Sequence, residues 1–425
     1  MIGIAMRLRY RPRTCLITTA AAIPVLLTGC ARGIQPPNTL FIAYGIEDSW
    51  FSKESKTLIE GRITEFTENF KRTSPNTNVV LFGYKFGQLQ EHIISDTKLN
   101  LGPDLIVSAS GLIKSLHNKG YVDALPARIN WDQTYSPLLK EIASIKGQYV
   151  AAPVLIFTQV ACYNKRTVPA SPQTIQELEE LTASGTRVGL SLEPQDLWWT
   201  AGSMGAIKEM SALGLNTSKT TKFKAIRSWL AWLRKAALYK NISFFKSELR
   251  KDESLINGEL DWISCDAGGI EQLRNKMGDT LGVSALPNGA QTAAFPIPYF
   301  ISFGLGSSSS KSQRDAAIKY IQSSTNLIVQ RQLMLRNTDF LPTNKNVSIP
   351  TRSSQALQAV NTSFNDQVRG YSEEWPGVIR FISGKKNNPN RYQELRSALA
   401  DLISGYLTVD QTLDIFTSFS EGSKP

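Results

Sequence analysis

The chain has 425 residues, with 47 Lys and Arg against 36 Asp and Glu, and a formal net charge of +11. This length exceeds what one hydrophobic core supports and favours two lobes. The basic residues are scattered, with no stripe interleaved with aromatic residues, which argues against a nucleic-acid-binding protein. The only histidines, His92 and His117, have no cysteine or carboxylate nearby at zinc-binding spacing, so we expect no metal site and no cofactor.

The first 30 residues have the pattern of an export signal. Four arginines within 1–13 precede an apolar run from Cys15 to Leu27, which is too short for a permanent membrane span. Leu27-Thr28-Gly29-Cys30 resembles the bacterial lipobox, in which the cysteine is lipidated and becomes the first mature residue. We therefore expect a signal peptide over 1–29, lipidation of Cys30 and a tether over 30–39. A plain signal peptide with an incidental cysteine is the alternative.

Strands and helices are expected to alternate in the next part of the chain, which predicts a parallel sheet. Ile59, Ile63, Phe66 and Phe70 form one apolar helical stripe, and Asp104 is expected to close a turn through its own backbone. The expected strands are Leu40–Tyr44, Val79–Phe82 and Leu105–Ser108, with a helix over Leu89–Leu99.

The stretch from Tyr149 to Leu178 is the most informative part of the sequence. Val154–Cys162 is almost entirely apolar and predicts one buried strand. Thr174, followed three residues later by Glu177, predicts a capping box that opens a helix. Further on we expect strands at Arg187–Leu192 and Ile301–Leu305, and helices capped by Ser312 with Asp315 and by Asn326.

The order of these motifs resembles extracellular solute-binding proteins of family 1, the maltose-binding-protein type, over roughly residues 40–345. The motifs that carry the resemblance are Gly102-Pro103-Asp104 before a strand, Gly120–Leu125, Leu281–Pro287 and Phe340–Thr343. The resemblance also implies a short helix over Leu255–Leu260, a strand and glycine turn over Trp262–Gly269, and a strand from Leu281. Each motif is weak alone, but their order and spacing are more specific. The resemblance implies an α/β, two-lobed periplasmic-binding-protein fold with a hinge of three chain crossings. It implies lobe one over 40–155 plus 297–342 and lobe two over 156–296 plus 343–425.

The resemblance also implies where a ligand binds. Glu193 and Pro194 match a Glu-Pro-aromatic stretch that contacts sugar in maltose-binding protein, but Gln195 replaces the aromatic residue. Trp198 or Trp199 could supply the ring instead; the alternative is that this pair packs a helix against the sheet. The expected ligand-binding residues are Ser108, Ser110, Glu193, Trp198, Trp199, Asp266, Gly268, Tyr299 and Trp375.

The function implied is that of a non-enzymatic, lipid-anchored substrate-binding component of an ABC importer. Its expected partners are a sugar, glycoside or polyol, a membrane permease and, through the lipid, the membrane; the body is expected to be a monomer facing the periplasm or the cell exterior. A sensor that presents its ligand to a membrane receptor is a third reading. The alternative function is a cell-surface hydrolase of a carbohydrate or peptide-like substrate, using Ser308 of a Ser-x-x-Lys motif or a carboxylate pair.

Cys162 and Cys265 would remain in the exported body, where the compartment permits a disulfide. They are either bridged or buried as small apolar residues.

The lipidation hypothesis predicts that a Cys30→Ser variant is left unprocessed or unanchored. Membrane fractionation and the mass of the mature N-terminus measure both properties. Normal membrane attachment of this variant would remove the claim.

Overall fold

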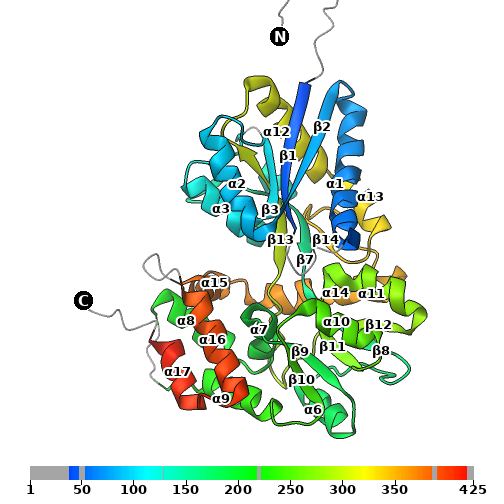
Figure 1. The fold of residues 1–425 in the computed structure, drawn as a ribbon, viewed down its shortest axis with the longest axis vertical. Coiled ribbons are helices and arrows are strands. Elements are labelled where there is room, and N and C mark those ends of the chain that lie inside the picture. The colour runs from blue at the N-terminus through cyan, green and yellow to red at the C-terminus, as the bar shows by residue number, and fades with distance from the viewer. Residues whose placement is uncertain (1–37, 47–52, 128, 218–221, 385–389, 419–425) are drawn as a thin grey trace, which may run out of the picture. The chain divides into compact units, whose positions relative to one another are not determined.

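The computed structural model describes residues 38–46, 53–127, 129–217, 222–384 and 390–418 (Figure 1). The signal sequence and Cys30 lie outside these ranges. None of the helices within them is long and apolar enough to cross a membrane. The described strands form two separate larger sheets and one small hairpin, in agreement with the two-lobed α/β fold expected from the sequence.

The first sheet has the strand order β14-β7-β13-β3-β1-β2, with β4 paired to β13. The strands β1, β2 and β3 are parallel, whereas β13 runs antiparallel to β3 and β7. The Asp104 carboxylate accepts a hydrogen bond from the Phe41 N–H (2.8 Å), so it ties β1 to the start of β3 instead of closing its own turn. The strands are β1 (Asn38–Ile46), β2 (Thr77–Lys85), β3 (Leu105–Ala109), β4 (Val122–Asp123), β7 (Ala152–Phe157), β13 (Tyr299–Gly306) and β14 (Leu341–Pro342).

Helices cover both faces of this sheet (Figure 1). The predicted stripe residues Ile63, Phe66 and Phe70 are buried in the same cluster as Ile42, whereas Ala43 belongs to the cluster on the opposite face. This alternation along β1 is the period-two pattern of a strand covered on both sides. The helices of this lobe are α1 (Lys53–Thr73), α2 (Phe86–Lys98), α3 (Ser110–Asn118), α4 (Trp131–Thr134), α5 (Pro137–Ala143), α12 (Lys311–Thr325) and α13 (Leu327–Arg336), with the hairpin β5 (Ser144–Ile145) and β6 (Gln148–Tyr149).

The second sheet has the order β10-β9-β11-β8-β12. The strands β10, β9 and β11 are parallel, and β8 runs antiparallel to β11 and β12. Its strands are β8 (Gln159–Asn164), β9 (Val188–Ser191), β10 (Ile242–Phe245), β11 (Trp262–Asp266) and β12 (Leu281–Ser284). The helices that follow or pack around it are α6 (Ile175–Ala183), α7 (Pro194–Ser203), α8 (Ile207–Leu215), α9 (Lys224–Ala236), α10 (Glu248–Ile256), α11 (Ile270–Met277), α14 (Gln355–Thr362), α15 (Trp375–Ser383), α16 (Arg391–Ser404) and α17 (Val409–Thr417).

The stretch Val154–Cys162 is two strands, not the single strand expected. The chain leaves the first sheet after Phe157 and enters the second at Gln159, with only Thr158 between them. The Thr158 carbonyl accepts a hydrogen bond from Ala267 N–H (2.9 Å), and its hydroxyl lies 2.9 Å from the Ser363 hydroxyl. Both strands are buried on both faces, so the hydrophobic pattern continues unbroken through the crossing.

Two of the three predicted N-cap residues are correct, although Glu177 does not complete the predicted capping box, because its carboxylate accepts from the Gln173 N–H (2.7 Å) and not from that of Thr174. The side chains of Thr174 and Asn326 accept hydrogen bonds from backbone N–H groups in the first turns of α6 and α13, at 3.1 and 2.9 Å. The cap of α12 is Ser310 rather than Ser312 with Asp315, because the backbone is still extended at Ser310 and the helix begins at Lys311.

Cys162 and Cys265 form a disulfide, with their Cα atoms 5.9 Å apart. They stand on the neighbouring antiparallel strands β8 and β11, where Cys162 lies opposite Ile263 and Cys265 is two residues further along. Because residues two apart in a strand share a face, the two thiols point to the same side of the sheet. Of the two states left open by the sequence, the structure has the bridged one.

Replacing both cysteines by alanine should lower the free energy of unfolding by about 2–4 kcal/mol, because a bridge between positions 103 residues apart restricts the unfolded chain. Urea unfolding of the two proteins measures the difference. As a control, reductant should destabilise the native protein and leave the double variant unchanged. Equal stability of the two proteins would contradict the prediction.

Candidate functional site

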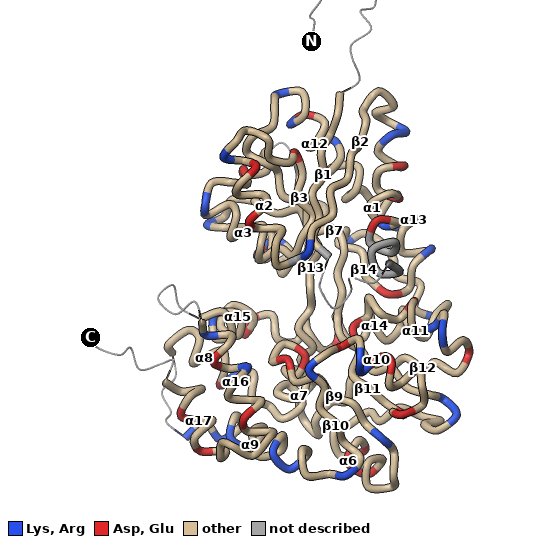
Figure 2. Tube along the Cα trace, in the orientation of Figure 1, with Lys and Arg blue, Asp and Glu red and all other residues tan. Residues whose placement is uncertain are grey.

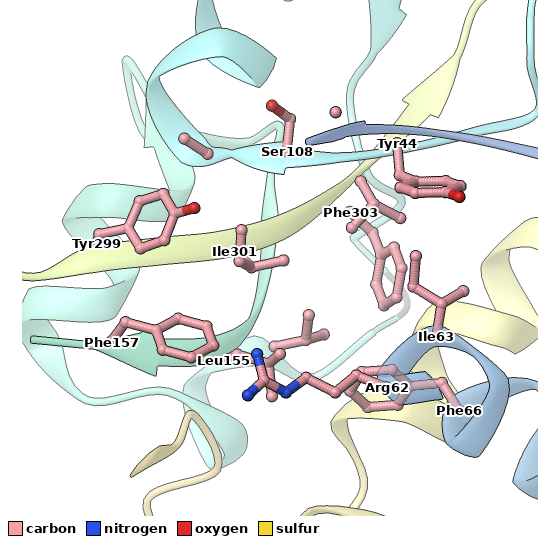
Figure 3. A pocket seen from close by; sticks show the side chains of 14 residues that line it. Tyr44, Arg62, Ile63, Phe66, Ser108, Leu155, Phe157, Tyr299, Ile301 and Phe303 are labelled. Carbon is pink, nitrogen blue, oxygen red and sulfur yellow. The ribbon is translucent and has the colours of Figure 1, made fainter. Parts of the chain in front are cut away.

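The carboxyl ends of β1 and β3 open onto a pocket in the first lobe (Figure 3). It encloses about 700 Å³, including space open to solvent. Its polar side chains are Arg62, Ser108 and the hydroxyls of two tyrosines, and the rest of the lining is apolar. The labelled lining residues are Tyr44, Arg62, Ile63, Phe66, Ser108, Leu155, Phe157, Tyr299, Ile301 and Phe303. Ligands of open α/β sheets bind at such strand ends, so this pocket is a candidate half-site.

The two predicted serines have different surroundings. Ser108 lines the pocket, and its buried hydroxyl has no hydrogen-bond partner among the described residues. The Ser110 hydroxyl lies 2.6 Å from that of Ser302 and 3.5 Å from the Phe300 carbonyl oxygen. Ser110 therefore joins α3 to β13, whereas Ser108 has an unused hydroxyl at the end of β3.

Tyr299 lies at the edge of the pocket, where the chain returns from the second lobe. Its ring centroid is 5.8 Å from that of Phe157, and Figure 3 shows the two rings near each other at one end of the pocket. An exposed aromatic face suits the apolar C–H side of a sugar ring. The predicted position of Tyr299 is thus compatible with ligand contact.

Arg62, which the sequence reasoning did not single out, reaches from α1 toward the Phe157 ring (Figure 3). Its guanidinium lies 5.2 Å from the Phe157 centroid and 5.5 Å from the Phe340 centroid, and it pairs with the buried carboxylate of Asp339. Burial raises the pKa of Asp339 to about 6, although Arg62 acts to lower it. Arg62 precedes the buried Phe66 by four residues, so both lie on the same face of α1. This spacing was the feature of the sequence that could have identified Arg62 as a residue facing the core.

The second lobe has a group of charged residues at the carboxyl ends of its parallel strands, which we call the acidic cluster: Asp196, Glu248, Asp252 and Asp266 around Lys251. Acidic positions lie near the labels α7 and α10 in Figure 2. These residues stand in the first turn of α7 after β9, on α10 after β10, and at the end of β11. Among the described residues, no group of His, Cys, Asp or Glu has the arrangement of a metal site.

Hydrogen bonds hold the cluster together. The Asp196 carboxylate accepts from Gln159 Nε2 (2.8 Å) and from the Ser191 hydroxyl (2.9 Å). Lys251 is fully buried and donates to Glu248 at 2.6 Å. The predicted residues Asp266 and Gly268 lie at its edge, where the Asp266 carboxylate accepts from the Gly268 N–H at 2.6 Å. The cluster therefore contains one predicted site residue, Asp266, with the predicted Gly268 bound to it, and sequence reasoning missed the other members.

Burial dominates the ionisation of this cluster. It raises the pKa of Asp196 well above its ordinary value and that of Asp252 to about 7; Glu248 and Asp266 raise both further, and Lys251 lowers both. Burial acts to lower the pKa of Lys251, but its acidic neighbours outweigh this and leave the pKa raised. Lys251 is thus positively charged at neutral pH, while the pKa of about 7 leaves Asp252 partly protonated there.

Glu193 is already engaged by side chains of α16. One of its oxygens accepts from Arg396 Nε and Nη2 at 2.9 and 2.6 Å, and the other accepts from the Tyr392 hydroxyl at 3.1 Å. Burial and the Glu193 carboxylate raise the pKa of Tyr392. Glu193 is the N-cap residue of α7, but its side chain bonds to α16 and not to the first turn of α7. Its contact with a ligand stays a prediction.

The predicted tryptophans lie in the core. Trp198 and Trp199 have no exposed surface and pack against Trp229 and Trp262, at centroid distances of 5.1 and 6.2 Å. This is the packing role that the sequence left open beside the binding role, and these rings present no free face to a ligand. Trp375 is also buried, edge-on to Phe295 and Phe300.

The two half-sites adjoin along the crossing strand. Phe157 lines the first-lobe pocket and Gln159 donates to the acidic cluster, and only Thr158 separates them. Two residues of extended chain span about 7 Å.

Comparison with known proteins gives the fold an independent test. No protein-family model matches the chain. A maltotriose-binding protein of Pyrococcus abyssi is 33% identical over 82 residues, which is 19% of this chain and 18% of that protein's length. The GacH receptor of Streptomyces glaucescens, solved unliganded and with acarbose, superposes with a TM-score of 0.70 at 14% identity, over 90% of this chain and 97% of its own. The chain has the maltose-binding-protein fold.

A second structure extends this agreement, which confirms the resemblance inferred from the sequence. A cyclo/maltodextrin-binding protein complexed with maltotetraose matches with a TM-score of 0.67 at 12% identity, over 93% of this chain and 100% of its own.

Arg62→Met should destabilise the protein by about 3–5 kcal/mol, because it leaves the buried Asp339 carboxylate unpaired. The double variant Arg62→Met/Asp339→Leu should recover most of that loss. Urea unfolding measures both. Arg227→Met, which breaks the exposed pair with Asp410, is the matched control and should change stability by less than about 1 kcal/mol. Similar losses for Arg62→Met and Arg227→Met would show that the buried pair is not stabilising the lobe.

Proposed function

We propose that the protein is the lipid-anchored substrate-binding component of an ABC importer and captures a sugar, glycoside or polyol between its two lobes. One observation carries the proposal: an aromatic pocket and an edge rich in hydrogen-bond acceptors adjoin at the strand ends of the two sheets. Structures of the same fold include complexes with acarbose and with maltotetraose, which supports a carbohydrate ligand.

The chemistry of the two half-sites matches a polyhydroxylated molecule. Tyr299, which packs against the buried Phe157 ring, would offer a ring face to sugar C–H groups, and the carboxylates of the acidic cluster would accept hydrogen bonds from hydroxyls. A phosphate or dicarboxylate ligand would call for arginine forks. Arg62 is the arginine of the pocket, and Asp339 already neutralises it.

The lobes would close around the ligand by rotation at three connections. These are the crossing at Thr158, the segment between β12 and β13, and the segment between β14 and α14. We propose the lobe boundaries expected from the sequence, 40–155 plus 297–342 and 156–296 plus 343–425, with the first boundary moved to Thr158 because β7 continues to Phe157. The closed form would be presented to a membrane permease, with Cys30 and its lipid holding the exported body at the membrane and no reaction catalysed.

The alternative from the sequence, a cell-surface hydrolase, gains no support from Ser308. This serine lines a different pocket, beside Phe41 and Phe82. Its hydroxyl is buried and has no hydrogen-bond partner among the described residues, so none of them is placed to activate it as a nucleophile.

The proposal predicts that neutral oligosaccharides such as maltotetraose, or smaller sugars and polyols, raise the melting temperature of the full-length protein in detergent, because they bind only the native state. Tyr299→Ala should weaken binding about 2- to 12-fold through loss of ring contact. Tyr406→Ala, which removes a tyrosine that is 83% exposed, is the control and should bind normally.

Isothermal titration gives the dissociation constants. A shift with amino acids or phosphate esters alone would refute the carbohydrate assignment. Cleavage of the oligosaccharide during incubation would favour the hydrolase instead.

A further inference from the structure

We propose that one end of the first lobe, where β1 begins, rests on the surface of an anionic lipid bilayer. We call this end the amino edge; it consists of the segments 71–76, 97–102, 118–121 and 307–312. The proposal rests on the lipid anchor of the proposed function and adds a second contact between the protein and the membrane. The occupant of this surface is the leaflet that holds the lipid on Cys30.

The topology of the first sheet brings these segments together. A helix between two parallel strands returns the chain from the carboxyl end of one strand to the amino end of the next. The last turns of α1 and α2 therefore lie beside the starts of β2 and β3 (Figure 1). The antiparallel strand β13 ends here, where the Ser307 N–H donates to the Tyr121 carbonyl (3.3 Å). Close by, Asn38 Nδ2 donates to the Ser312 carbonyl (3.0 Å).

The amino edge is basic and contains no acidic residue. Of the carboxylates nearest in the chain, Glu68 and Asp315 lie about one turn further along α1 and α12. Asp96 lines a separate pocket, and Asp123 pairs with Arg314. The basic side chains of the edge are exposed and have no hydrogen-bond or ion-pair partner in the ranges that the structure describes. They are Lys71, Arg72, Lys98, Lys119 and Lys311.

Helix stability explains only part of this arrangement. Basic residues in the last turn of a helix interact favourably with the helix dipole, which accounts for Lys71, Arg72 and Lys98. Lys311, however, is the first residue of α12, where a positive charge is unfavourable. An anionic group outside the protein would compensate this charge.

Two exposed leucines lie among these charges. Leu99 and Leu101 are 68% and 75% exposed. The turn that holds them is ordered, because their N–H groups donate to the Asp96 carbonyl at 3.0 and 2.8 Å and Asn100 between them is left-handed (φ 59°). Scattered leucines are ordinary on a protein surface, but leucines beside basic residues are typical of segments that lie in a membrane interface. The pair therefore favours a bilayer over a soluble polyanion.

The length of the tether makes this contact accessible. Asn38, at the start of β1, follows Cys30 by eight residues. Such a segment spans about 28 Å at most, and about 16 Å on average as a flexible coil. The second value is about two Debye lengths at physiological ionic strength. The anchor would therefore hold the amino edge at a high effective concentration beside the lipid headgroups.

Docking at the amino edge leaves the ligand site free. The pocket that contains Tyr44 and Ser108 lies at the carboxyl ends of β1 and β3, which are the opposite ends of the same strands. The lobe would stand on the bilayer with this pocket directed away from the lipid, in a position to capture a solute from solution.

The test uses the lipidated mature protein reconstituted into vesicles of phosphatidylcholine, with or without phosphatidylglycerol. Asn118→Cys places a thiol at the exposed end of α3 for an environment-sensitive dye. Cys162 and Cys265 are bridged and Cys30 carries the lipid, so they do not react. Dye emission should shift to shorter wavelength only with phosphatidylglycerol, and about 1 M salt should reverse the shift. Tyr406→Cys, at an 83% exposed position of the second lobe, is the control and should show no shift.

A matched pair of charge variants locates the effect. Lys71→Gln/Lys98→Gln should lower the ratio of docked to undocked protein about 25-fold, because each lysine near an anionic surface contributes about fivefold. Lys240→Gln/Lys276→Gln removes the same charge from exposed positions on the second lobe and should dock normally. Both variants should keep the melting temperature and the sugar affinity of the parent protein, since none of the four lysines lines the pocket.

The outcomes separate this proposal from the proposed function. Equal dye emission in the two kinds of vesicle would show that the docking surface is wrong, while anchoring and carbohydrate capture stand. A shift that survives in Lys71→Gln/Lys98→Gln would overturn the assignment to the amino edge. If mass spectrometry finds no lipid on Cys30 and the protein washes off both kinds of vesicle, the anchor and the docking are both wrong, and carbohydrate capture still stands on its own titration.

Discussion

The rest of the structure depends on how the chain is held at Thr158. This residue is the whole connection between β7 of the first sheet and β8 of the second. Its carbonyl is bound by the Ala267 N–H, and Ser363 bonds both to its hydroxyl and to the Gln159 carbonyl (2.7 Å). Two distant segments, at Ala267 and at Ser363, thus hold one crossing. Because the connection is a single residue, Phe157 of the pocket lies only two positions from Gln159, which donates a hydrogen bond to the acidic cluster.

The pocket and the acidic cluster differ in how their buried charges are paired. In the first lobe Arg62 and Asp339 neutralise each other one to one, so the pocket around them is otherwise apolar. In the second lobe Lys251 faces several carboxylates. Burying a charge without a partner is costly. These carboxylates are tolerated because burial and their neighbours raise the pKa of Asp196 and of Asp252, so that these two groups keep protons more readily than an exposed carboxyl.

The sequence predicted the order of strands and helices well, since strands buried on both faces and amphipathic helices each have a clear period. It failed where the deciding contact is distant in the chain. Nothing local to Glu193 indicates that Arg396 and Tyr392, some 200 residues later, bind its carboxylate. The helix α10 was expected to begin near Leu255, because Glu248–Asp252 has the charged composition of a solvent-exposed face. The burial of Lys251 results from packing against residues that are distant in the sequence, so no periodic sequence pattern reveals it.

The same distant contacts determine which parts of the second lobe move together. Glu193 ties the start of α7 to α16. The first turn of α7 carries Asp196, so this part of the acidic cluster is linked to the C-terminal helices as well. The helices α8 and α15 approach so closely that a Cβ atom at Gly214 would overlap the Gly377 carbonyl oxygen, and one at Gly377 would overlap the Ser211 hydroxyl. Close backbone packing of this kind has little freedom to slide. The C-terminal helices are therefore built into the lobe that carries the acidic cluster. Closure would move this cluster as one rigid body toward the pocket, with the change in backbone angles confined to the three connections between the sheets.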